Sequence, residues 1–238
     1  MGQVVNNNIV GAVGNVVFYT MNGKSYIRTK PSPHRKKYTD VVKNLHDVFG
    51  TVSRYGTAMI RSMSDQLSFP FTQPLYNRLR GWMRNAYASH RDETVWELSA
   101  AGYNICQVNA ETDLRDFIGG GFSVSDEGTG KIRVILPEMN PLRQIKAPAN
   151  TIAVNVKIII ASSAFKEQGL RSRVCNAAYR VDYADRLFPA KEILLATNSA
   201  AGDIAIVVIA LEFEMDDQVY NKALPWLPAA IIAMGKMK

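Results

Sequence analysis

The chain has 238 residues, of which 47% are hydrophobic and 21% charged, an ordinary globular composition with enough length for one large domain or two small ones. Its longest apolar stretches, residues 204–211 and 224–234, are shorter than the roughly 20 residues that a membrane-spanning helix needs. Residues 1–20 lack the basic start and apolar run of a secretory signal, so we expect a cytoplasmic protein with no membrane span.

Positive charge is concentrated in the first part of the chain. Residues 1–91 hold 13 Lys or Arg and 3 acidic residues, whereas residues 92–238 hold 15 and 18. Such a division is typical of an anionic partner for the basic part, or of identical copies that meet basic face to acidic face. The sequence permits both arrangements.

Residues 15–30 have the pattern of a β-hairpin. Two β-branched and aromatic runs, NVVFYT and KSYIRTK, flank Asn22-Gly23, the dipeptide best suited to a type I′ turn because both central residues take positive φ. A two-stranded ribbon is marginal alone in water, so it must pack on its own chain or on a neighbour. We expect it to contact a neighbouring subunit through Val16, Val17, Phe18, Tyr26 and Ile27.

A basic arm follows the hairpin and completes a first segment over residues 1–38. Pro31 and Pro33 exclude a helix or a central strand there. We interpret the arm as a solvated linker, a phosphate-binding arm, or a tether across an acidic neighbour. It has no aromatic residue before Tyr38, which gives little support to base stacking. Its cations are Arg28, Lys30, Arg35, Lys36 and Lys37.

This opening region resembles the N-terminal signature of a bacterial family of unknown function, which reads Gly-x-x-Gly-Asn-Val-Val, a short Gly-containing turn, and Arg-x-Lys-Pro. The resemblance implies helices after the arm and a sandwich-like C-terminal region, and it implies no activity. The matching residues are Gly11, Gly14, Asn15, Val16, Val17, Gly23, Arg28, Lys30 and Pro31.

Residues 39–98 are predicted to form a helical segment. Apolar residues recur at close to a 3.6-residue period over 39–67, which predicts a long amphipathic helix. Residues 68–74 break this pattern, and a second helix is predicted over 75–90.

Residues 99–238 are predicted to form an antiparallel β-sandwich. Short strand patterns alternate with turn signals and not with helices. The fold class expected for the whole chain is therefore α+β, with an N-terminal β-hairpin and basic arm, a helical middle segment and a C-terminal sandwich. The candidate strands are 104–109, 117–124, 131–137, 151–163, 171–183, 190–198 and 203–214.

The final sixteen residues are unusually apolar for a terminus, since termini are commonly polar. Two interpretations stay open. The segment closes the chain's own core, or it makes a subunit contact anchored by Trp226 and Ile231.

The sequence shows no arrangement of residues typical of catalysis, and we expect no catalytic, cofactor or metal site. The three histidines, His34, His46 and His90, have no ligand spacing. The glycine-rich residues 119–131 lack the phosphate-loop pattern and precede a strand. Cys106 lies 69 positions from Cys175, and both are expected to be buried free thiols.

One acidic cluster alternates off the end of the last long strand pattern. It could bind a cation or meet the basic arm of another copy, but surface ion pairs are the favoured interpretation. The cluster consists of Glu212, Glu214, Asp216 and Asp217.

Two functional hypotheses remain. The first is a non-enzymatic structural protein that self-associates through the N-terminal hairpin and arm and the C-terminal tail, into a ring or a filament. The second is a nucleic-acid-binding module that uses the basic half. No small-molecule substrate is indicated. The second hypothesis uses Lys30, Arg35, Lys36, Lys37, Arg78, Arg80 and Arg84.

Overall fold

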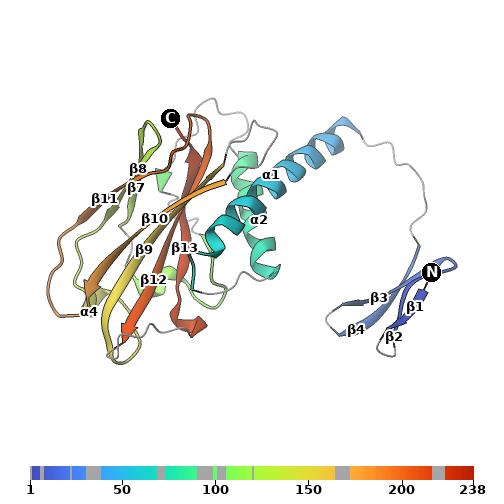
Figure 1. Ribbon diagram of the computed structural model, residues 1–238, viewed down its shortest axis with the longest axis horizontal. Coiled ribbons are helices and arrows are strands. Elements are labelled where there is room, and N and C mark those ends of the chain that lie inside the picture. Colours follow the sequence, from blue (N-terminus) through green and yellow to red (C-terminus); the bar gives the residue numbers. More distant parts are fainter. Residues whose placement is uncertain are drawn as a thin grey trace. The chain divides into compact units, whose positions relative to one another are not determined.

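The chain consists of two compact units, Met1–Lys43 and Asn44–Lys238. Strands open the chain, the two longer helices follow, and further strands complete it (Figure 1), which confirms the α+β class. The computed structural model describes residues 2–5, 8–21, 23–30, 39–68, 73–89, 99–100, 106–119, 121–163, 172–215 and 223–238.

The described strands of the first unit form one four-stranded antiparallel sheet in the order β1-β2-β3-β4, called the N-terminal sheet below. The predicted hairpin is its second half, in which Met21 pairs with Lys24 across a two-residue turn. Gly23 has φ 74° there, as this turn requires, while Asn22 lies outside the described residues. The other two strands were not expected from the sequence. The four are β1 (Gly2–Val5), β2 (Asn8–Val13), β3 (Val16–Met21) and β4 (Lys24–Thr29).

Two long helices follow, α1 (Asp40–Ser64) and α2 (Gln73–Ser89), within three residues of the predicted limits. A membrane-spanning helix is absent from the described ranges, because no helix there combines enough length with enough apolar character. Three short helices occur later among the residues that the structure describes, α3 (Leu114–Phe117), α4 (Pro141–Gln144) and η1 (Leu224–Trp226).

The described strands of the second unit form a nine-stranded antiparallel sheet, called the body sheet. Its order is β10-β9-β12-β13-β5-β7-β8-β11, and β6 pairs with β13 beside this path. The strands are β5 (Ser99–Ala100), β6 (Cys106–Gln107), β7 (Ser123–Gly128), β8 (Lys131–Leu136), β9 (Thr151–Ser163), β10 (Ser172–Asp182), β11 (Lys191–Ala196), β12 (Ile204–Met215) and β13 (Ala229–Lys236).

The body sheet curls so that its β7-β8 part faces β9 and β12 across an inner core (Figure 1). Ile132 of β8 and Ile158 of β9 both belong to this core. The two end strands approach each other, since the Lys191 Nζ of β11 lies 5.8 Å from the Tyr179 ring centroid of β10. The prediction of antiparallel strands is confirmed, whereas the two separate sheets of a sandwich are not seen, because hydrogen-bonded pairing runs continuously from β10 to β11.

A second core lies between the outer face of the body sheet and the helices. Alternate residues of β12 enter the two cores, for example Val207 the inner one and Val208 the outer one. Met59 and Met63 of α1 and Leu79 of α2 complete the outer core. Both faces of β9 and β12 are thus covered, which explains their near-continuous apolar sequences. The described helices of the predicted segment 39–98 and the strands of the predicted segment 99–238 therefore share the outer core.

Candidate interaction surfaces

The two faces of the N-terminal sheet differ in chemistry. Residues directly opposite on antiparallel strands share a face, and successive residues alternate between faces. The pairs Phe18↔Ile27 and Tyr19↔Tyr26 therefore lie on opposite faces. The uncharged face consists of Val13, Val16, Phe18, Thr20, Ser25, Ile27 and Thr29. The basic face consists of Ala12, Val17, Tyr19, Met21, Lys24, Tyr26 and Arg28.

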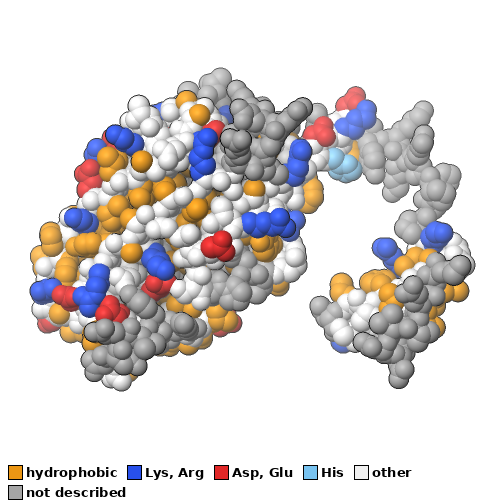
Figure 2. All heavy atoms as spheres, viewed as in Figure 1, with side chains coloured by type: hydrophobic (Ala, Val, Ile, Leu, Met, Phe, Trp, Pro, Cys, Tyr) orange, Lys and Arg blue, Asp and Glu red, His pale blue; other side chains and the backbone are white. Residues whose placement is uncertain are grey.

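No side chain described between Ile9 and Lys30 is buried. Ile27 is 66% exposed and Val13 50% exposed, both on the uncharged face. Figure 2 shows orange hydrophobic side chains at the surface of this unit. Full burial of one such side chain contributes about 1.5–3 kcal/mol, so the sheet presents apolar surface whose burial would be strongly favourable.

The basic face carries an ordered stack of side chains. The Tyr19 and Tyr26 rings stack with centroids 5.5 Å apart and planes 21° apart. The Arg28 guanidinium lies 5.5 Å from the Tyr19 centroid. Lys30, one residue beyond β4, continues the alternation onto this face and donates its backbone N–H to the Asn15 carbonyl at 2.7 Å.

A second uncovered apolar surface lies on α1. Its apolar stripe is buried against the body sheet from Val52 to Met63. Toward the N-terminus of the helix the same stripe is open, with Leu45 48% and Phe49 52% exposed. Val41 continues it one turn further. These three residues, spaced by four, lie on one helix face and are called the α1 stripe.

The C-terminal segment takes the first of its two interpretations. Ile231 is completely buried in β13, between β12 and the short strands β5 and β6. Trp226 contacts Phe117 and Phe213 edge-on, at centroid distances of 5.7 and 6.3 Å. Ile231 is therefore buried within its own chain, whereas Trp226 packs on aromatic side chains of its own chain and stays partly exposed.

The predicted basic residues are divided among different environments. Arg78 donates to the backbone carbonyls of Gln107 and Val108, at 2.5 and 3.1 Å. Arg80 donates to Ser53 Oγ at 3.3 Å. Arg84 is exposed. Arg35, Lys36 and Lys37 lie outside the described residues, as do His34 and His90.

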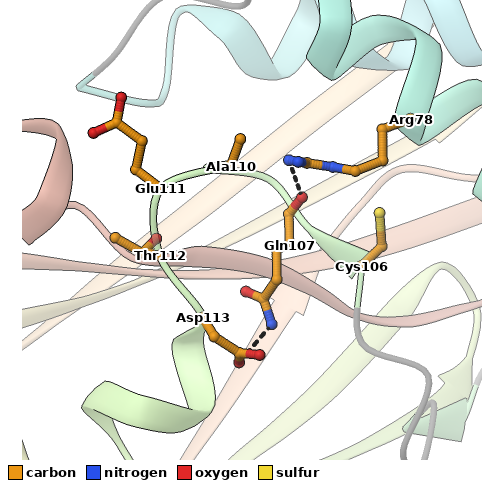
Figure 3. A pocket seen from close by; sticks show the side chains of 7 residues that line it. All are labelled: Arg78, Cys106, Gln107, Ala110, Glu111, Thr112 and Asp113. Atoms are coloured by element: carbon orange, nitrogen blue, oxygen red, sulfur yellow. Dashed lines mark hydrogen bonds between the residues drawn. The ribbon is translucent and has the colours of Figure 1, made fainter.

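An open pocket of about 570 Å³ lies beside β6 and the loop after it. Figure 3 shows the Arg78 side chain reaching over it to the Gln107 carbonyl, while the Gln107 amide donates to Asp113 Oδ1 at 2.8 Å. Burial raises the pKa of Cys106 to about 11, against a smaller opposing effect of Arg78. The thiol is therefore protonated at neutral pH and a poor nucleophile. The residues that line the pocket are Arg78, Cys106, Gln107, Ala110, Glu111, Thr112 and Asp113.

The acidic cluster forms ion pairs within the chain. Glu212 accepts hydrogen bonds from Lys157 Nζ at 2.7 Å and from Ser68 Oγ. Glu214 accepts two from Arg180, at 2.8 and 3.3 Å. Asp216 and Asp217 lie outside the described residues. Across the part that the structure describes, no group of three or more His, Cys, Asp or Glu is placed to hold a metal ion.

Comparison with known proteins supplies no relative. No family model, curated protein or solved structure matches the chain.

The structure shows exposed apolar residues on α1 that sequence reasoning did not single out, and it separates the hairpin residues that sequence reasoning named. Val16, Phe18 and Ile27 share the uncharged face, whereas Val17 and Tyr26 lie on the other. The two-residue alternation of a strand was the available signal for this separation. The helical period of apolar residues was also a signal for the α1 stripe. The period does not show which part of the helix packs on the body sheet, because that depends on where the sheet ends.

Proposed function

We propose that the chain is a non-enzymatic structural protein that assembles with copies of itself through the N-terminal sheet. The observation that supports this is the uncharged face, an apolar surface that no described residue covers. A single-layer sheet gains stability when such a face packs on a helix or another sheet. A neighbouring copy supplies such a surface in the assembly that we propose.

The contact uses Val16, Phe18 and Ile27, which lie together on the uncharged face. The sheet also has two outer strands, β1 and β4, each paired on one side only among the described residues. Strand edges of this kind accept a further strand from another chain. Face packing supplies the apolar burial, and edge pairing is the route by which the contact can extend.

The α1 stripe of the next copy is the surface that we assign to receive this face. Leu45 and Phe49 are large, apolar and half exposed, and a helix packed on a sheet face is a common layered arrangement. Because donor and acceptor are different surfaces, the contact is heterologous. Repetition of a heterologous contact gives a ring where the rotation closes and a filament where it does not.

The first experiment compares two matched substitutions, Ile27→Lys on the uncharged face and Met21→Lys on the basic face. Both replace an exposed apolar residue of the same hairpin. By sedimentation velocity, wild type should form concentration-dependent species above the monomer mass of 26.4 kDa. Ile27→Lys should weaken association by about 30-fold or more, since loss of a central contact residue costs about 2 kcal/mol or more, and Met21→Lys should not.

A mixing experiment tests the heterologous geometry. Phe49→Lys removes the acceptor and Ile27→Lys removes the donor, so each variant alone should be monomeric. Mixed in equal amounts, the two retain one intact donor and one intact acceptor, and should form a dimer and nothing larger. A monomeric wild type at high concentration, or a mixture that stays monomeric, contradicts the proposal.

A further inference from the structure

The basic face of the N-terminal sheet has a second, independent character. Of the three cations of residues 1–30, Lys24 and Arg28 lie on it, and Lys30 follows them in the same alternation one residue beyond β4. This segment contains no acidic residue. The opposite face has no charge at all. A sheet that needed charge only for hydration could carry it on either face or at its edges, so the segregation indicates an anionic ligand for one face.

Aromatic rings lie between these cations. Along β4, Lys24, Tyr26 and Arg28 occupy successive positions of the same face, about 7 Å apart. The Arg28 guanidinium and the Tyr26 ring both contact the Tyr19 ring. Tyr26 lies on the outer strand β4 and is 37% exposed. Another flat ring can therefore be added at Tyr26, with a cation on each side of it along the strand.

We propose that the basic face binds single-stranded nucleic acid, with an unpaired base stacked at Tyr26 and the flanking phosphates paired with Lys24 and Arg28. Exposed aromatic rings on an antiparallel sheet, bordered by Lys and Arg, are a common platform for unpaired bases. In a duplex the base faces are already stacked, so the arrangement favours a single strand. The inference uses the face opposite to the one in the proposed contact and does not depend on it.

The test measures fluorescence anisotropy of fluorescein-labelled (dT)16 and U16 with the full-length chain. Wild type should bind, and Tyr26→Leu should weaken binding about tenfold or more, because stacking on an aromatic side chain is worth that much per base. Tyr26→Phe should retain affinity, because it keeps the ring. Tyr179→Leu, the same change on strand β10 of the body sheet, is the matched control and should bind like wild type.

Salt dependence tests the charge contribution. For single strands the slope of log K against log salt concentration changes by about 0.7 per phosphate contact. The double variant Lys24→Gln, Arg28→Gln should therefore have a slope about 1.4 smaller in magnitude than wild type. The cations of residues 31–38 are present in every variant, so they do not contribute to the difference.

Three outcomes would overturn the inference: no binding to either oligonucleotide, equal affinity of Tyr26→Leu and wild type, or tighter binding to the corresponding duplex. Equal affinity with a normal salt slope would identify a surface that recognises charge alone. Sedimentation of the same samples reports self-association separately, so failure of one proposal leaves the other measurable.

Discussion

The N-terminal sheet and the body sheet are built from similar residues but differ in how far their side chains are buried. Both are antiparallel and rich in β-branched and aromatic side chains. In the body, β9 and β12 are covered on one face by the inner core and on the other by helices. In the N-terminal sheet no described side chain is buried. Residues with high strand propensity thus form both sheets. Only the body sheet buries its apolar side chains against other elements of its own unit.

The largest effect expected from this comparison concerns one side chain in each sheet. Phe213 is completely buried and packs on Phe117 and Trp226, so Phe213→Ala should lower the free energy of unfolding by about 3–5 kcal/mol. Ile27→Ala, on an exposed position, should change it by less than about 0.5 kcal/mol. Urea unfolding at a concentration where the chain is monomeric measures both. A large loss for Ile27→Ala there would mean that its own chain already covers the uncharged face.

An intermediate effect is expected at the Glu212 carboxylate. It is nearly buried and accepts from both Lys157 and Ser68. Glu212→Ala leaves both donors without this acceptor and should cost about 1–3 kcal/mol. The control is Asp40→Ala, which breaks the exposed Asp40–Lys43 pair at 2.9 Å and should cost at most about 0.5 kcal/mol. Equal losses of unfolding free energy for the two variants would contradict the prediction that the buried ion pair contributes more stability than the exposed one.

The smallest expected effect is a dependence of stability on pH, caused by Cys106 in the second unit. The pKa of Cys106 in the folded chain is about 11, against an ordinary value of 9.0, because the thiol is desolvated. Above pH 9 the unfolded chain loses this proton while the folded chain keeps it, so stability should fall between pH 9 and 11 and be unaffected below pH 9. Comparison of wild type with Cys106→Ala at pH 8 and pH 10 isolates this effect. Identical pH responses of the two proteins would contradict it.

Local patterns predicted the parts of the fold that depend on local physics. The turn at Gly23 and the two long helices follow from turn chemistry and a 3.6-residue period. Strands β1 and β2 were missed because Asn6, Asn7 and Asn8 and the glycines after them are typical of turns. The continuous order of the body sheet was beyond sequence reasoning, because it depends on pairing between strands far apart in the chain.

The candidate surfaces were predicted only in outline. The hairpin residues that were expected to contact a neighbour are half-buried or exposed in the structure, but the prediction treated them as one set although adjacent strand residues alternate between faces. The apolar character of residues 223–238 did not distinguish a central strand from a contact segment, since both bury the same side chains. Only the pairing of β13 with β12, β5 and β6 separates these interpretations.

The end strands of the body sheet bear on how growth of an assembly would be limited. Strand β10 has Arg173 near one end and Arg180 near the other, and β11 begins with the charged pair Lys191 and Glu192. Charge on an outer strand discourages uncontrolled strand addition and fibrous aggregation. In the N-terminal sheet the outer strand β4 has its cations on one face only. The charged outer strands therefore disfavour strand pairing between the body sheets of two copies. An assembly through the N-terminal sheet needs this property if it is to stay ordered and not precipitate.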